Sequence, residues 1–373
     1  MTAQEPINYA WFSQKLLDWH QLHGRKNLPW QKNPTPYRVW ISEIMLQQTQ
    51  VATVIPYYER FMQRFPDYRS LASASMDDVL NLWAGLGYYA RGRNVHRTAQ
   101  LVIKEHDGEL PVDIDQLQKL PGLGRSTAAA ILSLAHHQCQ AILDGNVKRV
   151  LTRFHAIEGW PGQRNVLKTL WSLAEKHTPK KNTARYTQAI MDLGATLCTR
   201  SSPLCQQCPV NTDCTAYKND TVTQYPASKP KKKLPTRKTI MLMLVNRDNA
   251  VLVIKRPPTG IWGGLWALPE CSEQNTLKDW CRNTLHIKIG DYEIHPGWRH
   301  SFTHYHLDIT PVLARISGDT SCVMDDSQHL WYNATKNYAI GLATPTAKLL
   351  KQYFFKEITN DTYGALRKIK SRN

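Results

Sequence analysis

Two glycines separated by a single residue lie in the stretch LPGLGRSTA, which runs from Leu120 to Ala128. A proline precedes the glycines and helix-forming residues follow them, so the stretch predicts a tight turn that leads into a helix over Ser126–Ala135. Glycines let a phosphate come close to the backbone, and the N-terminus of a helix attracts it. The loop therefore predicts binding to a nucleic-acid backbone without readout of base sequence. From the loop alone, a plain helix–turn–helix linker is an equal alternative.

The charge of the chain agrees with an anionic partner. The 373 residues carry a net charge of +17, and the sequence pI is about 9.5. Such a chain favours nucleic acid or an anionic membrane surface, although positive charge also serves solubility. The longest apolar run, Ile240–Val245, has the length of a strand, and residues 1–24 lack a signal-peptide pattern. We expect a cytoplasmic, nucleoid-associated monomer that binds nucleic acid and no membrane.

Helical signals fill the first part of the chain. Asn8 is suited to cap a first helix and Gly24 to end it, and Pro36 opens a second helix with apolar residues at i, i+3 and i+4. From Thr239 onward the pattern changes to strands and shorter helices. The predicted strands are Ile240–Val245, Val251–Ile254 and Leu307–Leu313, with helices near Leu277–Leu285 and Thr344–Phe355. The expected chain is multidomain: a helical domain over residues 1–219, a basic linker over 220–238, an α+β domain over 239–361 and a basic tail over 362–373.

Four of the eight cysteines form one cluster with the spacing Cys-x6-Cys-x2-Cys-x5-Cys. They are Cys198, Cys205, Cys208 and Cys214. Four thiolates on one short loop can enclose a tetrahedral zinc ion or an iron–sulfur cluster, and the ligands alone leave both open. The other four cysteines are scattered and are predicted to be buried thiols.

Glu43 is the first candidate acid. On a helix it lies away from the apolar stripe that contains Ile44, so an ordinary solvated glutamate is the simple interpretation. However, Val39 and Leu46 occupy the i−4 and i+3 positions. A carboxyl group between apolar side chains has a raised pKa and can act as a general acid near neutral pH.

Asp144, in the segment ILDGNV after the glycine loop, completes a chemical pair with Glu43. Cleaving an N-glycosidic bond requires protonation of the departing base and stabilisation of an oxocarbenium-like sugar, work that two carboxyl groups divide in glycosidases. The pair and the loop resemble the MutY-type adenine DNA glycosylases, members of the helix-hairpin-helix, endonuclease III-like superfamily. The resemblance implies that Glu43 protonates the purine and later helps to activate water. It implies that Asp144 stabilises the sugar cation or captures it covalently, with retention.

Ser126 separates two branches of that superfamily. By resemblance, bifunctional relatives carry a lysine at this position, which forms a Schiff base with the sugar and nicks the strand. A serine hydroxyl cannot form that imine, so we expect a monofunctional glycosylase that leaves an abasic site. Some relatives place a tyrosine here, which leaves the role of Ser126 itself open.

The resemblance also assigns a cofactor and contact residues. It favours a [4Fe-4S] cluster over zinc at the four cysteines, with a structural and DNA-docking role. By the same resemblance, Tyr88 would wedge into the DNA helix when the base is flipped; a core aromatic in a glycine-bounded turn is the plain alternative for this residue. The implied DNA contacts are Gln48, Thr49, Tyr88, Gly122, Gly124 and Ser126. The implied adenine pocket comprises Arg25, Leu28, Trp30 and Gln188.

The second domain resembles a MutT-like (Nudix-like) domain at Gly263–Glu270, GGLWALPE. The paired glutamates that bind metal in such hydrolases are missing from the following residues 271–280, so we expect a sheet that binds without hydrolysing. Phe302, Thr303 and His304 resemble the loop that reads 8-oxoguanine opposite the target adenine; the family commonly has serine where Thr303 stands. A solvated strand edge is the plain interpretation of the histidines in this region.

The resemblance, carried by these motifs in the same order along the chain, implies an adenine DNA glycosylase of base excision repair that acts on double-stranded DNA with adenine opposite 8-oxoguanine or guanine. Three rival hypotheses remain. A bifunctional glycosylase for oxidised pyrimidines is opposed by Ser126 and the second domain. A DNA-binding iron–sulfur protein that senses redox state would excise no base. A nucleotide pyrophosphatase is opposed by the missing metal-binding glutamates.

Overall fold

The computed structural model describes residues 8–230, 233–272, 276–317, 328–333, 336 and 338–354. Contacts within the chain divide it into two compact units. The first unit, here called the helical unit, contains Met1–Ser73 and Asn94–Lys231. The second, here called the sheet unit, contains Ala74–Arg93 and Lys232–Asn373. A short segment from the middle of the helical sequence therefore belongs to the sheet unit.

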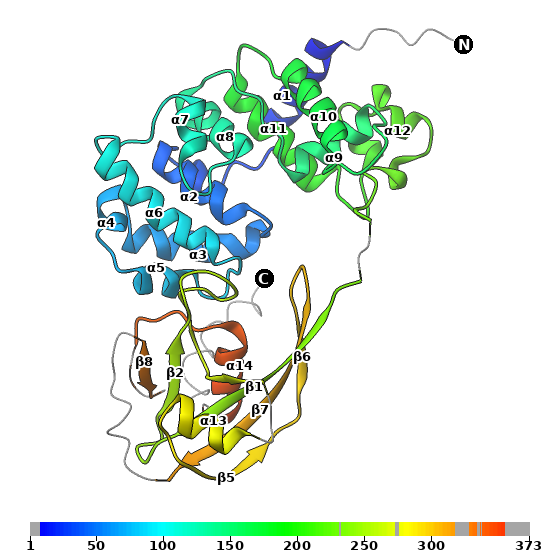
Figure 1. Ribbon diagram of the computed structural model, residues 1–373. Coiled ribbons are helices and arrows are strands. Elements are labelled where there is room, and N and C mark those ends of the chain that lie inside the picture. The colour runs from blue at the N-terminus through cyan, green and yellow to red at the C-terminus, as the bar shows by residue number, and fades with distance from the viewer. Residues whose placement is uncertain are drawn as a thin grey trace, which may run out of the picture. The chain divides into compact units, whose positions relative to one another are not determined.

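The helical part of the chain consists of α-helices joined by turns and longer loops (Figure 1). The helices before the glycine loop are α1 Tyr9–His23, α2 Pro36–Leu46, α3 Val51–Arg64, α4 Tyr68–Ala72, α5 Met76–Trp83, α6 Ala90–Glu105 and α7 Ile114–Lys119. Those after it are α8 Arg125–His136, α9 Gly145–Phe154, α10 Arg164–His177, α11 Thr183–Thr196 and α12 Thr215–Lys218. Single 3-10 turns occur at Pro29–Gln31, Cys205–Gln207, Asn211–Asp213 and Val222–Gln224.

Capping residues explain where several helices begin. The Asn8 side chain accepts a hydrogen bond from the Trp11 amide at 2.9 Å and starts α1. Thr35 caps α2 in the same way, and Pro36 occupies the first turn, where its missing N–H has no cost. The predicted starts of the first two helices are thus confirmed, as is the end of α1 at Gly24.

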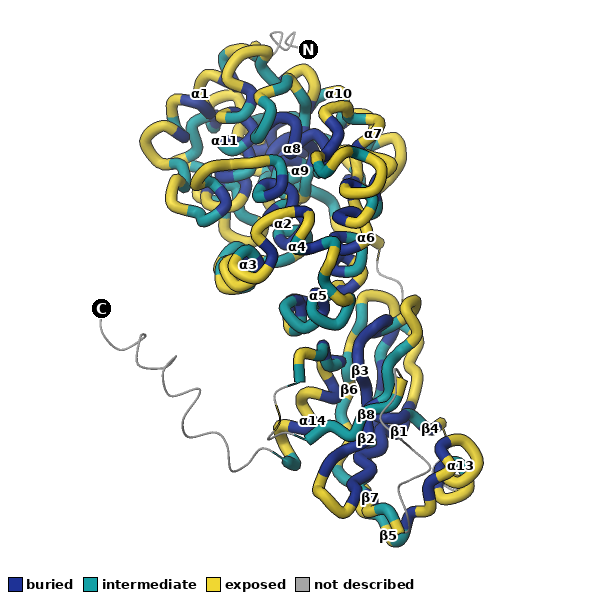
Figure 2. Tube along the Cα trace, turned by 90° about the vertical axis from the view of Figure 1, so that its left-hand side faces the viewer, coloured by how far each residue is buried: buried dark blue, intermediate teal, exposed yellow. Residues whose placement is uncertain are grey.

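The core of the helical unit is enclosed by α1, α8, α9, α10 and α11. Residues Ala128–Ser133 of α8 are all buried, which Figure 2 shows as a continuous dark stretch at the centre of this unit. Phe12 of α1 meets Phe154 of α9 edge-on at 4.7 Å between ring centroids. Since α8 and α9 lie in this tightly packed region, the residues at their N-termini have a rigid support.

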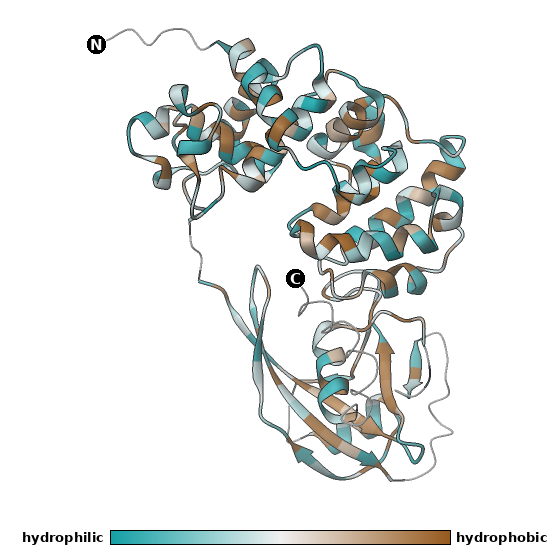
Figure 3. Ribbon diagram, turned by 180° about the vertical axis from the view of Figure 1, so that it is seen from behind, coloured by the Kyte–Doolittle hydropathy of each residue, from teal (hydrophilic) through white to brown (hydrophobic). Residues whose placement is uncertain are grey.

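The sheet unit is built on an eight-stranded sheet with the main order β3-β2-β1-β7-β5. Its centre is the parallel pair β1 and β7, aligned from Thr236 opposite His306 to Val245 opposite Arg315. The alternating residues Ile240, Leu242 and Leu244 of β1 pack with α13, and Figure 3 shows the apolar character of these central strands. The elements are β1 Thr236–Val245, β2 Val251–Lys255, β3 Trp266–Ala267, β4 Glu270–Cys271, α13 Leu277–Thr284, β5 Ile289–Ile294, β6 Trp298–Ser301, β7 His306–Ile316, β8 His329–Tyr332 and α14 Thr344–Phe354.

Several local expectations need correction. The hairpin helix begins at Arg125, one residue earlier than predicted. Strand β1 begins at Thr236, inside the stretch assigned to the linker, because its first residues pair with β7. Cys139 is exposed and not buried, whereas Cys271 and Cys281 are buried as predicted. The predicted basic tail 362–373, the last residue of the helix predicted to reach residue 355, and the cysteine at position 322 lie outside the described residues. Within the described part, none of the helices has the length and apolar character that crossing a bilayer requires.

Candidate active site

The glycine loop joins α7 to α8 and forms a helical hairpin. Gly122 has φ of +82°, a conformation that favours glycine, and buried Leu123 anchors the turn. Gly124 caps α8 and is exposed, and a Cβ atom placed there would meet no atom within 4 Å. The first N–H groups of a helix lack intrahelical acceptors. The loop therefore offers an open backbone surface with the partial positive charge that a phosphate group requires.

Asp144 is placed next to this hairpin by α9. It is the N-cap residue of α9, and its Oδ1 accepts a hydrogen bond from the Val147 amide at 2.7 Å. The Ser126 Oγ in the first turn of α8 accepts a hydrogen bond from the Leu143 amide at 3.0 Å. The hydroxyl group whose role the sequence left open thus holds the backbone directly before Asp144.

Glu43 lies on α2, which packs against α8. The residue keeps some contact with solvent, but its carboxyl group is deeply set in the protein. Burial, and to a smaller extent the charge of Asp144, raise the pKa of Glu43 to about 8. The pKa of Asp144 is also raised, because the effect of burial is larger than that of the hydrogen bonds from the first turn of α9, which lower it. The structure therefore brings the two carboxyl groups into one electrostatic site in which Glu43 holds a proton at neutral pH.

Two of the predicted pocket residues meet at a carboxylate that the sequence analysis missed. Asp192 on α11 is 0% exposed. It accepts hydrogen bonds from the Arg25 amide at 2.8 Å, from the Arg25 guanidinium at 2.6 and 2.9 Å, and from the Gln188 side chain at 2.9 Å. The Nε2 atom of His20 lies 3.4 Å from the same carboxylate. These partners lower the pKa of Asp192 although burial opposes them. A signal existed in the sequence, since Asp192 follows Gln188 by one helical turn inside an apolar segment.

The other two predicted pocket residues lie at the 3-10 turn after α1, Leu28 directly before it and Trp30 within it. The Leu28 amide donates to the Gln31 side chain at 3.2 Å. Trp30 is buried and meets the Tyr58 ring edge-on at 5.4 Å. Trp30 therefore serves at least as a core residue that fixes this turn against α3.

The predicted duplex probes lie in strained turns. Gln48 has φ of +58° and is exposed, between α2 and α3. The neighbouring Gln47 donates to Thr127 Oγ1 of α8 at 3.3 Å, which ties this turn to the hairpin helix. Thr49 Oγ1 donates to the Gln47 carbonyl at 3.4 Å. Left-handed backbone at non-glycine residues is costly and is typical of functional positions.

Tyr88 lies in the segment of the sheet unit that precedes α6. It has φ of +49° and is 48% exposed, so the core-aromatic interpretation is wrong. The Arg91 guanidinium lies 5.5 Å from its ring centroid. An exposed tyrosine held at this angle is suited to contact a base.

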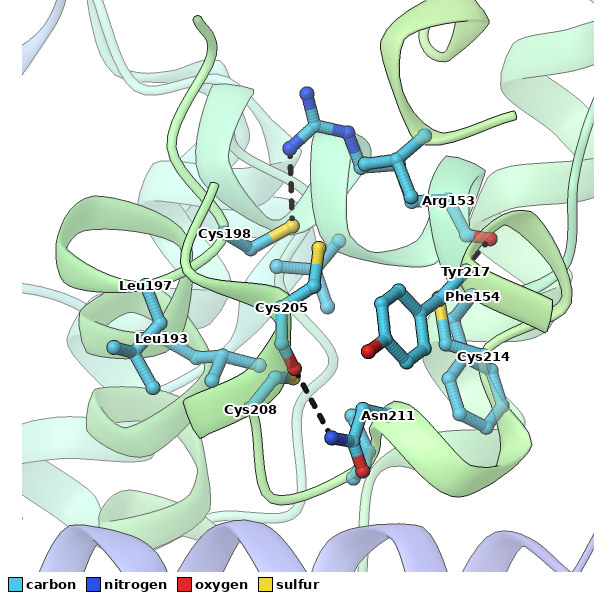
Figure 4. Close-up of a pocket in the computed structure, with 13 residues that line it drawn as sticks. Arg153, Phe154, Leu193, Leu197, Cys198, Cys205, Cys208, Asn211, Cys214 and Tyr217 are labelled. Atoms are coloured by element: carbon cyan, nitrogen blue, oxygen red, sulfur yellow. Dashed lines mark hydrogen bonds between the residues drawn. The ribbon is translucent and has the colours of Figure 1, made fainter. Parts of the chain in front are cut away.

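The four clustered cysteines line one cavity in the helical unit (Figure 4). All four are free thiols, and Arg153 donates to Cys198 Sγ at 3.3 Å. The rest of the lining is mostly apolar and includes Phe154, Leu193 and Tyr217. Within the described ranges, no three His, Cys, Asp or Glu residues are grouped closely enough to bind one metal ion.

Helix α9 connects this cavity to Asp144. Arg149 donates to the Cys198 carbonyl at 2.7 Å, to the Gly194 carbonyl at 2.6 Å and to Asn146 Oδ1 at 2.8 Å. One turn later, Arg153 donates to the Thr199 carbonyl at 2.7 Å. A Cβ atom at Gly194 would lie 2.6 Å from the Asn146 Cβ. The close approach of α9 and α11 at this point therefore requires a residue without a side chain. The sequence analysis missed both arginines, although their i, i+4 spacing puts them on one face of a helix.

The predicted recognition residues form the tip of the β6–β7 hairpin. The Phe302 amide donates to the Tyr305 carbonyl at 2.9 Å, and the two rings stack at 4.7 Å. Thr303 and His304 are both exposed at this tip. The neighbouring His306 is paired with Ser301 through a 2.9 Å contact between Nδ1 and Oγ. The aromatic pair therefore supports two exposed polar side chains.

Comparison with known proteins identifies both parts of the chain. A family model for the HhH-GPD superfamily base excision DNA repair protein matches residues 41–176, and a NUDIX domain model matches residues 240–352. An adenine DNA glycosylase of Buchnera aphidicola subsp. Schizaphis graminum is 40% identical over 341 residues, which cover 91% of this chain and 98% of that protein. The chain belongs to the adenine DNA glycosylase family. As a family member it is a DNA glycosylase, a hydrolase of base excision repair, which confirms the predicted enzyme class.

Further relatives agree with this membership. The adenine DNA glycosylase of Homo sapiens is 32% identical over 409 residues, which cover 92% of this chain and 74% of that protein. The solved structure of a thermostable thymine-DNA glycosylase has a TM-score of 0.52 and 25% identity, and covers 57% of this chain and 97% of that chain. The fold class is confirmed: a helical HhH-GPD domain followed by a Nudix domain with a sheet.

Proposed function

We propose that this family member excises adenine that lies opposite 8-oxoguanine or guanine in double-stranded DNA. The observation that carries the proposal is the coupled carboxyl pair, in which burial and the charge of Asp144 raise the pKa of Glu43 to about 8. A carboxyl group that keeps its proton at neutral pH has the property that a general acid needs. The net charge of +17 and the exposed hairpin loop support duplex DNA as the partner. We propose that the protein acts on this DNA as a monomer.

The two carboxyl groups divide the reaction between them. The target base leaves the stack before its glycosidic bond can be reached. Glu43 gives its proton to the departing adenine as the bond from the sugar to the base breaks. Asp144 stabilises the positive charge that forms on the sugar, or captures it as a covalent ester. Glu43, now a carboxylate, accepts a proton from the attacking water, which returns both groups to their initial states and leaves an abasic site.

Ser126 supports a monofunctional reaction. Its hydroxyl group accepts a hydrogen bond from the Leu143 amide. A hydroxyl group cannot form an imine with the sugar, as a lysine amine does. The strand that has lost its adenine therefore stays intact until alkali or another enzyme cleaves it at the abasic site. In this role Ser126 is a positioning residue for the Asp144 backbone.

The exposed tip residues Thr303 and His304 support recognition of the base opposite adenine. The hydroxyl and imidazole groups offer donors and acceptors for the polar edge of 8-oxoguanine. For the duplex itself, we assign contacts to Gly122 and Gly124 in the hairpin. The remaining contact and pocket residues keep the roles that the family resemblance implies: probing by Gln48 and Thr49, wedging by Tyr88, and adenine binding by Arg25, Leu28, Trp30 and Gln188.

A [4Fe-4S] cluster fits the four cysteines that line one cavity. The residues that would hold it are Cys198, Cys205, Cys208 and Cys214. Four free thiols and an arginine that donates to Cys198 Sγ suit a negatively charged group. When bound, the cluster supplies a rigid crosslink of the loop after α11. Iron and acid-labile sulfide in the purified protein, with the visible absorbance of a cluster, are the expected result; zinc without iron would contradict this assignment.

The test of the function uses excess protein and duplex DNA that holds one adenine opposite 8-oxoguanine. After the reaction, one half of each sample is treated with alkali and both halves are run on a denaturing gel. We expect strand breaks only after alkali, and none with Glu43→Gln. Glu59→Gln is the matched control, because Glu59 is an exposed glutamate on α3 and its loss should leave the rate unchanged.

The alternative hypotheses predict different patterns of strand breaks and base release. Breaks without alkali would identify a bifunctional lyase and refute the argument from Ser126. Tight binding to the duplex without release of adenine would favour a non-catalytic DNA-binding protein. Equal activity of Glu43→Gln and the unchanged protein would exclude Glu43 as the acid.

A further inference from the structure

The loop between β2 and β3 holds a tryptophan in an unusual backbone conformation. Trp262 has φ of +54° and is only 7% exposed. It lies between Gly260 and Gly264, which have φ of +85° and +76°. The Trp262 carbonyl accepts the Leu265 amide at 2.9 Å, which closes the turn. Left-handed backbone is rare for a bulky residue and persists only where surrounding contacts enforce it.

The indole ring of Trp262 supports the tip of the β6–β7 hairpin. It lies 5.4 Å from the Phe302 ring and 5.8 Å from the His300 ring, between centroids. Those two rings meet each other edge-on at 4.6 Å. The three side chains thus form an aromatic cluster beneath the exposed tip residues Thr303 and His304. Aromatic contacts of this kind restrict the orientation of every ring in the cluster.

The same loop also contacts the segment Ala74–Arg93, which belongs to the same compact unit. Arg93 Nη1 donates to the Gly263 carbonyl at 2.6 Å. Lys255, directly before the loop, pairs with Asp77 of α5 at 2.8 Å. This segment also carries Tyr88. The loop therefore contacts both the segment with the exposed tyrosine and the hairpin with the exposed tip, and Trp262 provides ring contacts to the hairpin.

We propose that Trp262 is a positioning residue for recognition of the base opposite adenine, acting through Phe302 on Thr303 and His304. This inference rests on the proposed function, because it assumes that the tip reads the opposite base. Trp262 contacts neither substrate nor catalytic group in this role. Its loss lets the tip move, which weakens recognition of 8-oxoguanine and leaves the chemistry at Glu43 unaffected.

The test measures the preference for 8-oxoguanine over guanine. Single-turnover rates are compared on duplexes with adenine opposite 8-oxoguanine and opposite guanine, and affinities on duplexes in which 2′-fluoro-2′-deoxyadenosine replaces adenine. For Trp262→Leu we expect this preference to fall about tenfold, with an unchanged rate on the guanine duplex. Trp262→Phe retains an aromatic contact and should recover most of the preference. Trp280→Leu, which removes a partly buried tryptophan from the α13 core of the same unit, should leave the preference intact.

A second route tests the same contact from the other side. Phe302→Leu should reduce the preference as much as Trp262→Leu does, and the double variant should show no further loss, because one contact cannot be removed twice. If Trp262→Leu is too unstable to purify, Phe302→Leu and Trp262→Phe still give the answer. Equal losses on both duplexes would show a general structural role and overturn the inference.

His304→Ala separates failure of this inference from failure of the proposed function. If His304→Ala loses the preference while Trp262→Leu and Phe302→Leu keep it, the tip reads the base but does not depend on Trp262. If His304→Ala keeps the preference, the proposed role of the tip is wrong and this inference fails with it.

Discussion

Replacement of Glu43 by glutamine should stabilise the protein while it abolishes activity. Glutamine has nearly the same shape as glutamate but carries no titrating charge. The pKa of Glu43 is about 8 in the folded chain, against 4.5 for a glutamate in an unfolded one. At neutral pH the unfolded chain therefore carries a charge that folding must remove by uptake of a proton. This cost is absent from Glu43→Gln.

The size and sign of the effect follow from the pKa difference. Each pKa unit corresponds to about 1.4 kcal/mol, so the gap of about 2.5 units between pH 7 and the unfolded pKa corresponds to about 3 kcal/mol. Partial contact with solvent reduces this to about 2 to 3 kcal/mol. The raised pKa sets the window: the stability advantage of the Glu43→Gln variant is absent below pH 4.5, grows as the pH rises to about 8, and is constant above.

Thermal unfolding at pH 5, 7 and 8.5 tests this reasoning, with the unfolding of the helical unit followed by calorimetry. Glu59→Gln again serves as the exposed control and should leave the unfolding free energy unchanged at all three pH values. A stability difference that does not change with pH, or a Glu43→Gln protein less stable than the parent at pH 7, would refute the raised pKa. The same pKa predicts that the single-turnover rate of the parent falls as the pH rises through about 8, because the acid loses its proton.

Three further predictions concern residues around the site. Ser126→Ala should lower the single-turnover rate about tenfold at unchanged DNA affinity, because a backbone amide beside the catalytic aspartate loses its acceptor; a loss of affinity instead would make Ser126 a DNA contact. Asp192→Asn should lower the free energy of unfolding by about 3 kcal/mol in denaturant titrations, because it removes the buried negative charge that pairs with Arg25. The control Asp213→Asn, which changes an exposed carboxylate, should have little effect. Burial lowers the pKa of His155 to about 4 and of His177 to about 3, from 6.5, and their Nε2 atoms are 2.8 Å apart. The unfolding free energy should therefore decrease as the pH falls from about 6.5 to 4, and His155→Phe should flatten that decrease; an unchanged slope would contradict the neutral pair.

Local signals predicted the parts of the fold that local interactions decide. The cap at Asn8, the proline at the start of α2 and the turn at Gly122 follow from rules that involve only a few neighbouring residues. The start of β1 at Thr236 was not predictable in this way. It depends on pairing with His306, seventy positions away in the chain, and such pairing leaves no trace in a short window of sequence.

In the candidate site, too, features set by neighbouring residues were predictable and features set by distant residues were not. The apolar neighbours of Glu43 predicted a raised pKa, and the structure adds the charge of Asp144 as a second cause. In contrast, nothing near Arg25 in the sequence indicates that its partner is Asp192, 167 positions further on. Likewise, the role of Ser126 became visible only when the structure placed its hydroxyl against the Leu143 amide. Long-range pairing of polar groups is decided by the packing of helices and not by residue type.

The assignment of Ala74–Arg93 to the sheet unit has a consequence for modular engineering of this enzyme. A cut in the basic linker near Lys232 separates the chain in sequence but does not separate two complete folding modules. The fragment before the cut would keep Asp77 without Lys255 and Leu80 without its neighbour Gly264. A graft of a foreign Nudix domain onto the helical part would therefore have to carry the α5 segment with it, or redesign both surfaces together.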